Sequence, residues 1–317
     1  MPPPKRPPPK KATIVRDKSK LVIPQLDYGT PDDINEPSDD FNGYIRCIFG
    51  AKGVGKSTIA AQCPKNFTWM FEPLRRNLRI WQKNLVKKTA AEIMAGSDDP
   101  WQQLKDTIPR QLVDPNIETL TFDSADIAYE CCKHHIFALN GVTAPGESKN
   151  GPDIWGQVSD EWSGFFNILA GSRLAINLLS HLKNRENEEL DGGKVKRKSP
   201  SCSPACLLYI KQAADFIFFY GKVDGNKRVM QVRDEDGGTE CSAGAENRFY
   251  QPNGKPIYFL EMPDLLDKES GYDRLCSAFA NKCWDYYTTE AEKEIKSQAP
   301  ARKVPPQGGS KGPPRKG

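Results

Sequence analysis

Short runs of β-branched and aromatic residues recur along the middle of the chain, and segments with helical spacing of apolar positions separate them. The runs predict strands over 44–49, 67–71, 117–122, 173–180, 214–220, 228–233 and 257–261, with a hairpin turn at 224–226. The spacing predicts helices over 56–63, 74–95, 125–139, 153–170 and 269–296. This alternation is typical of α/β folds, so we expect a mainly parallel sheet flanked by helices.

Composition favours an intracellular protein. Apolar residues make up 38% and charged residues 27% of the 317 residues. No apolar run approaches the roughly 20 residues that a membrane span requires, and the basic, proline-rich N-terminus lacks the apolar core of a secretory signal. Nine cysteines, an odd number, fit a reducing compartment better than a disulfide scaffold. We therefore expect a cytoplasmic protein with no membrane span.

Positive charge is concentrated at the two ends of the chain. Residues 1–24 and residues 293–317 each contain seven Lys or Arg and one acid, so each end carries +6 and the rest carries −8 of the net +4. Such segments cannot bury enough apolar surface to fold. They act either as arms for nucleic-acid phosphates or only as solubilising tails. We predict disorder over 1–39 and 297–317, a folded core over 40–265 and a helical segment over 266–296.

A glycine-rich motif follows the first predicted strand. Residues 50–57 read GAKGVGKS, which fits the P-loop pattern G-x-x-x-x-G-K-[ST] before a predicted helix. Glycines let successive N–H groups turn toward phosphate oxygens, and the helix N-terminus adds its dipole. Lys56 would reach the β- and γ-phosphates of ATP, and the Ser57 hydroxyl would bind Mg²⁺. We predict that ATP is held by Gly50, Ala51, Lys52, Gly53, Val54, Gly55, Lys56, Ser57 and Thr58.

A second metal ligand is expected at the end of another strand. The strand over 117–122 leads into Asp123, and the carboxyl ends of parallel strands meet at one edge of a sheet. We predict that Asp123 holds Mg²⁺ together with Ser57. Capping of the next helix is the alternative role, and the two roles are compatible. Because Ser124 stands where many motor ATPases have a glutamate, the water-activating carboxylate must come from elsewhere.

Two further strand ends supply candidates for the catalytic step. Glu72 ends the strand over 67–71, and its carboxylate would face the γ-phosphate if that strand lies beside the P-loop strand. His181 ends the strand over 173–180 and can transmit the presence of the γ-phosphate to the segment that follows. The alternatives are a surface glutamate and a strand-end histidine without a catalytic role. We predict Glu72, Lys56 and His181 as catalytic residues.

The order of these parts resembles that of the RecA-like ATPases, and more closely that of the phage-encoded RecA-like ATP-binding proteins associated with single-strand annealing and recombination. Besides the P-loop, the resemblance rests on Phe71-Glu72, Thr121-Phe122-Asp123-Ser124, Trp155-Gly156, Ser180-His181 and Ala214-Asp215. It implies a RecA-like core, water activation by Glu72, and sensing of the γ-phosphate by His181. It also implies a homo-oligomer, either a ring or a filament.

The resemblance assigns contact with single-stranded DNA to the segment over 182–204, which the residues alone predict as a polar loop. Four acids accompany its basic residues, which are Lys183, Arg185, Lys194, Lys196, Arg197 and Lys198. Composition by itself is equally typical of a solvated loop. Related oligomers also insert a Lys or Arg from a neighbouring subunit, for which the candidates are Lys227, Arg228, Arg233 and Arg248.

Two other groupings have a structural and a functional interpretation. A zinc site could be formed by Cys131, Cys132, His134 and His135, with Cys202 and Cys206 completing the ligands. Adjacent cysteines on a helix are more typical of semi-buried side chains. An aromatic stripe over 155–169 could stack on bases, but its helical spacing favours core packing instead; it comprises Trp155, Val158, Trp162, Phe165 and Leu169.

These observations favour an ATP-hydrolysing RecA-like protein that binds single-stranded DNA in recombination or annealing and is stimulated by that DNA. A helicase-like or loader motor of the same fold is the first alternative. A P-loop kinase of a small molecule is the second, because the basic segment over 182–204 could serve as a lid. ATP turnover measured with and without single-stranded DNA separates the kinase from the other two.

Overall fold

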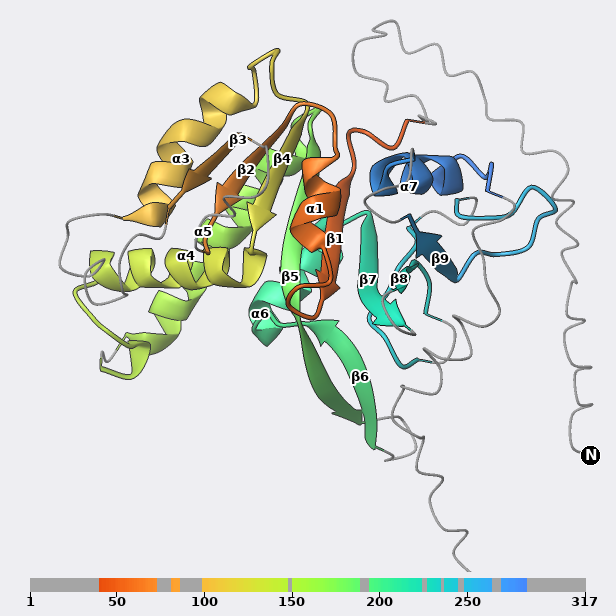
Figure 1. Cartoon of the computed structure of the whole chain (residues 1–317). Coiled ribbons are helices and arrows are strands. Elements are labelled where there is room, and N and C mark those ends of the chain that lie inside the picture. The colour runs from red at the N-terminus through yellow and green to blue at the C-terminus, as the bar shows by residue number, and fades with distance from the viewer. Residues whose placement is uncertain are drawn as a thin grey trace, which may run out of the picture. The chain divides into compact units, whose positions relative to one another are not determined.

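A mixed nine-stranded sheet forms the centre of the computed structural model (Figure 1), which describes residues 40–72, 81–85, 99–147, 150–188, 194–223, 227–234, 237–244, 248–263 and 269–283. The strand order is β3-β2-β4-β5-β1-β7-β8-β9, and β6 pairs with β5 outside this row. The predicted disordered ends over 1–39 and 297–317 lie outside the described residues.

Most of the strands and helices follow the predicted alternation, whereas the helices over 100–111 and 204–213 were not predicted. The strands are β1 (Ile45–Gly50), β2 (Asn66–Met70), β3 (Trp81–Asn84), β4 (Thr119–Asp123), β5 (Ala175–Glu188), β6 (Lys194–Pro200), β7 (Phe216–Val223), β8 (Lys227–Gln231) and β9 (Phe259–Met262). The helices are α1 (Lys56–Ala61), α3 (Pro100–Gln111), α4 (Ala125–Leu139), α5 (Gly151–Ala170), α6 (Pro204–Ala213) and α7 (Gly271–Phe279), with a short 3₁₀ turn at Pro145–Glu147.

The larger part of the sheet is parallel and buried. β1 lies between β5 and β7, both parallel to it, and β4 lies on the far side of β5. Every residue of β1 and β4 is buried, as expected for parallel strands covered on both faces. β7, β8 and β9 then pair antiparallel, and the pairing of β7 with β8 agrees with the predicted hairpin, whose turn residues 224–226 lie outside the described residues. The strand order and the P-loop after β1 make this a RecA-like P-loop α/β fold.

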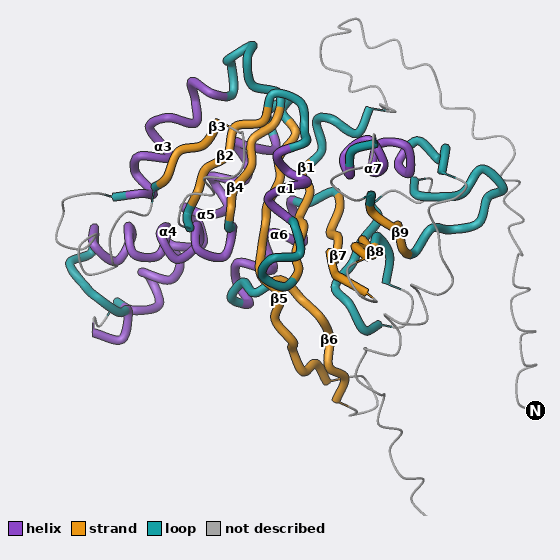
Figure 2. The backbone as a smooth tube through the Cα atoms, viewed as in Figure 1, coloured by secondary structure: helices purple, strands orange, loops and turns teal. Residues whose placement is uncertain are grey.

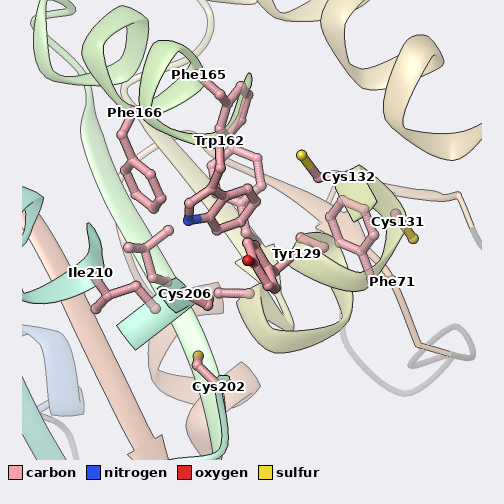
Figure 3. Packing of buried hydrophobic residues seen from close by; sticks show 14 of the residues in the cluster. Phe71, Tyr129, Cys131, Cys132, Trp162, Phe165, Phe166, Cys202, Cys206 and Ile210 are labelled. Carbon is pink, nitrogen blue, oxygen red and sulfur yellow. The ribbon is translucent and has the colours of Figure 1, made fainter. Parts of the chain in front are cut away.

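Helices cover the two faces of the sheet and enclose two apolar cores. One core joins the sheet to α3, α4, α5 and α6, and the other joins it to α1 and α7. Trp162 of α5 lies within the first core against Tyr129 and Phe166, with ring centroids 5.1 Å apart in both pairs (Figure 3). The core interpretation of the stripe on α5 is confirmed for four of its members, whereas Trp155 is 44% exposed.

Three expectations about secondary structure were wrong. Part of the predicted helix over 74–95 is the edge strand β3, which pairs in parallel with β2; residues 73–80 and 86–98 lie outside the described residues. The predicted helix over 269–296 ends at Phe279, and the part after Cys283 lies outside the described residues. The predicted loop over 182–204 is instead an antiparallel hairpin of β5 and β6 that leads into α6, as the tube view shows (Figure 2).

Candidate functional site

The P-loop has the backbone geometry that phosphate binding requires. Gly53 and Gly55 have φ angles of +80° and +109°, a region that L side chains avoid. At Gly50 the reason for glycine is different, because a Cβ there would lie 2.0 Å from the carbonyl oxygen of Tyr220 on β7. The three motif glycines are therefore needed for the path of the loop and for its close contact with the neighbouring strand.

Lys56 lies across the mouth of this loop. Its ammonium donates hydrogen bonds to the carbonyl oxygens of Gly50 at 2.8 Å and Ala51 at 3.0 Å. The side chain is only 8% exposed, so these bonds hold a largely desolvated positive charge at the centre of the motif. The P-loop motif predicts that a cation in this position meets the β- and γ-phosphates of a nucleotide.

Ser57 and Asp123 meet although they are distant in sequence. The Ser57 hydroxyl donates a hydrogen bond to Oδ2 of Asp123 at 2.5 Å, and Asp123 is buried at the last position of β4. The residue at the N-cap of α4 is Ser124, so the capping position predicted as an alternative for Asp123 is taken by its neighbour. The peptide bond between Asp123 and Ser124 is cis.

Glu72 and His181 also meet, with a third residue that the sequence did not single out. His181 Nε2 lies 3.0 Å from Oε1 of Glu72, and Nδ1 lies 3.1 Å from Oδ2 of Asp126. The bonds to Asp126 and to Glu72 raise the pKa of His181 to about 9, because both carboxylates stabilise the imidazolium. His181 is therefore a protonated bridge between two carboxylates at neutral pH.

The strand that precedes Glu72 has different neighbours from those on which the prediction for Glu72 depended. β2 pairs with β3 and β4 and does not lie beside β1, so the condition on which Glu72 was predicted to face the γ-phosphate is not met. Two strands separate β2 from β1. Glu72 follows the end of β2 and comes into the site through its contact with His181, which is carried by β5, the direct neighbour of β1.

Asp126 could have been noticed in the sequence from its spacing. It lies in the first turn of α4, three residues after Asp123, where an acid is favoured by the helix dipole. The helix dipole alone explains an acid at this position, so nothing in the sequence indicated that Asp126 contacts His181. The contact depends on the pairing of β4 with β5, which brings the end of each strand to the same edge.

The four candidates for an intersubunit cation lie in different surroundings. Arg228 donates from Nε to the carbonyl oxygen of Val54 at 3.2 Å and so contacts the P-loop of its own chain. Lys227 pairs with Glu261 at 3.9 Å, whereas Arg233 and Arg248 lie over the rings of Tyr250 and Phe279. A role between subunits stays a prediction for all four.

The proposed zinc ligands do not come together. Cys131 and Cys132 point to the side of α4 away from Cys202 and Cys206, with Tyr129 between the two pairs (Figure 3). Nδ1 of His135 contacts Asp99 instead. Among the described residues, no group of three or more His, Cys, Asp or Glu side chains could hold a metal ion. Burial raises the pKa of the Cys131 thiol to about 12, as expected for an inert, buried side chain.

Comparison with known proteins places the chain in a family. The profile of a family described as an AAA domain matches residues 42–239, a stretch that includes the P-loop, Glu72, Asp123 and His181. The chain belongs to this AAA-domain family. Together with the RecA-like strand order, membership of the AAA-domain family identifies a P-loop ATPase.

Other comparisons give little further information. No curated protein matches the chain. Among solved structures, a KaiC-like protein of the hyperthermophilic archaeon Pyrococcus horikoshii OT3 aligns with a TM-score of 0.31 and 14% identity, over 63% of this chain and 81% of that one. In the part of the chain that the structure describes, no helix is both long enough and apolar enough to cross a bilayer.

Proposed function

We propose that this AAA-domain protein hydrolyses ATP with Mg²⁺ and acts on single-stranded DNA in recombination or annealing of the phage type. The observation that carries the proposal is the position of His181. It bonds to Glu72 on one side, and its own strand continues without a break into the β5–β6 hairpin. A change in the contacts of His181 would therefore be passed along one strand to the surface proposed for DNA.

The residues of the P-loop fit a nucleotide and its metal ion. The positive φ angles of Gly53 and Gly55 suit a loop whose N–H groups face phosphates, and Lys56 supplies the charge. Ser57 and Asp123 would hold Mg²⁺, which takes hard oxygen ligands of this kind. When bound, Mg²⁺ neutralises charge that develops on the phosphates during transfer.

Glu72 is the proposed base for the attacking water. Its side chain is 12% exposed and lies against the charged His181, so the carboxylate is held in one place. A γ-phosphate would compete with Glu72 for the same imidazolium N–H, which gives His181 two alternative anionic partners. In this proposal, arrival of ATP releases Glu72 toward water and changes the position of the histidine at the root of the hairpin.

The hairpin supports DNA as the partner through the distribution of its charges. Lys196 pairs with Glu186 at 3.5 Å across the two strands, so this pair contributes little net charge. Lys183, Arg185 and Arg197 lie on the opposite face of the ladder, whose described residues include no acid. Arg185 also donates to the carbonyl oxygen of Cys202, and Asp234 interacts electrostatically with Arg197, so Lys183 is the exposed cation of the three. An exposed cation on this face is suited to a phosphate backbone.

The test is steady-state ATP turnover with and without a single-stranded oligonucleotide such as dT30, with the same oligonucleotide as a duplex for comparison. We expect stimulation by the single strand of several-fold or more, and none in a Lys56→Ala variant, which loses the phosphate contact. Turnover that ignores single-stranded DNA would contradict the proposed partner while leaving the ATPase intact. A strand-displacement assay then separates an annealing protein from a helicase-like or loader motor.

A further inference from the structure

A cavity lies beside the P-loop and is lined on one side by residues of β7. Its volume is about 390 Å³, which is in the range of small-ligand sites. Three lysines line it, each from a different element: Lys52 from the P-loop, Lys198 from β6 and Lys222 from β7. None of the described lining residues is acidic. Three positive side chains around one hollow create a positive potential that favours an anion.

Lys198 is the member of this group that the fold holds most firmly. Its backbone N–H donates to Gly238 at 2.9 Å, and its carbonyl accepts from Glu240 at 2.8 Å, while β6 pairs with β5 on the other side. The ammonium lies 4.9 Å from the centre of the Phe219 ring. Burial lowers the pKa of Lys198, which shows that its charge is partly desolvated.

The cavity shares part of the predicted ATP-binding loop but not the proposed metal ligands. Its P-loop lining runs over 51–54, and the described lining residues include neither Ser57 nor Asp123. On the hairpin side it is lined by Leu182 and Lys198, which lie on the same face of the β5–β6 ladder. The cavity therefore lies between the P-loop and the base of the hairpin.

We propose that this cavity is an anion site that takes a backbone phosphate of single-stranded nucleic acid, held by the ammonium of Lys198. The inference rests on the proposed action on single-stranded DNA and adds a contact at the base of the hairpin, on the face of the ladder opposite Lys183, Arg185 and Arg197. A phosphate would receive a charge-assisted hydrogen bond from Lys198, and it would reduce the repulsion among the three lysines. Because the P-loop forms the opposite wall, DNA bound here would contact the loop that binds ATP.

The test compares Lys198→Gln with Lys196→Gln in the full chain. Lys196 is the matched control, because it lies two residues away on the same strand, is 59% exposed and pairs with Glu186. Binding of a labelled dT30 is measured by fluorescence anisotropy at several salt concentrations. We expect Lys198→Gln to weaken binding about tenfold and to make the salt slope shallower by about 0.7, the value for one phosphate contact on a single strand.

The controls separate the cavity from the ATP site and from the fold. Lys196→Gln should change binding only about twofold, since its charge is already paired at the surface. Lys198→Arg should retain binding, which would exclude a general effect of altering the strand. Affinity for a fluorescent ATP analogue should be unchanged in all three variants.

Three results would overturn the inference. If Lys198→Gln binds dT30 as well as Lys196→Gln does, the cavity is not a phosphate site. If Lys198→Gln loses affinity for the ATP analogue to the same extent as for DNA, the cavity belongs to the nucleotide. If the unaltered protein does not bind dT30, the proposed DNA partner fails together with this contact, a result that differs from the first two.

Discussion

Short contacts between side chains from different helices and strands hold the candidate site together at the scale of residues. Ser57 contacts Asp123, and His181 contacts both Glu72 and Asp126. In each contact, a carboxylate meets a hydroxyl or imidazole group that could instead contact a phosphate or a metal ion. Binding of ATP would then replace internal partners by ligand atoms, so little polar surface would need to be newly desolvated.

Glu72→Gln should keep ATP binding and lower turnover about 10²-fold or more, because the amide cannot accept a proton from water. Glu118→Gln is a matched control, since Glu118 precedes β4 and forms an exposed pair with Lys65 at 2.7 Å, away from the strand ends that carry the site. Binding is followed with a fluorescent ATP analogue and turnover by release of phosphate. Turnover of Glu72→Gln equal to that of Glu118→Gln would remove Glu72 from the catalytic role.

The sequence predicted individual site residues better than it predicted their neighbours. The contact of Ser57 with Asp123 and the position of Lys56 in the P-loop follow from a motif and a strand end, which each define a position locally, while the roles of the three residues stay predictions. The contact of His181 with Asp126 on α4 was not predicted, because no local pattern indicates which helix begins beside which strand. Glu72 reaches the site across two intervening strands, which only the pairing of the whole sheet determines.

A clear apolar period led to a correct prediction for α5 but not for α3, whose buried Trp101, Leu104 and Ile108 also recur at helical spacing, and the polar strand β6 was missed. α5 shows the helical period in its buried side chains Ile154, Val158 and Trp162, and its predicted range was confirmed. β6 has the sequence KVKRKSP, in which charged residues replace the apolar alternation of a half-buried strand. Its register is determined by β5 instead, for example where Glu186 faces Lys196. The hairpin therefore had no apolar signal to distinguish it from a loop.

Substitutions of Trp162 measure how much α5 contributes to the stability of the core that joins the sheet to α3, α4, α5 and α6. Trp162 is 1% exposed and contacts the rings of Trp101 and Tyr129, so Trp162→Ala should lower the free energy of unfolding by about 3–5 kcal/mol. Among the described residues, the indole N–H is buried without a hydrogen-bond partner. Trp162→Phe should consequently cost much less than Trp162→Ala, because it removes an unsatisfied donor. Urea unfolding of both variants checks this, and equal losses would contradict it.

At the scale of the whole molecule, His181 links parts of the chain that the sheet holds apart. It lies on β5, whereas Glu72 follows β2 and Asp126 begins α4. Unfolding breaks both contacts at once. The proton on this histidine therefore reports whether β2, α4 and β5 are assembled, and the stability of the fold should depend on pH through it.

The sign of this pH dependence follows from the pKa of His181, which is about 9 in the folded chain and 6.5 without its carboxylate partners. Below pH 6.5 both states carry the proton and the stabilisation is complete. As pH rises toward 9, the unfolded chain has lost its proton and the folded chain still binds one, so the free energy of unfolding falls. Denaturant unfolding of the unaltered protein and of His181→Gln across this range measures the difference between them. That difference should shrink as pH rises, and a constant or growing difference would show that His181 is not charged between Glu72 and Asp126.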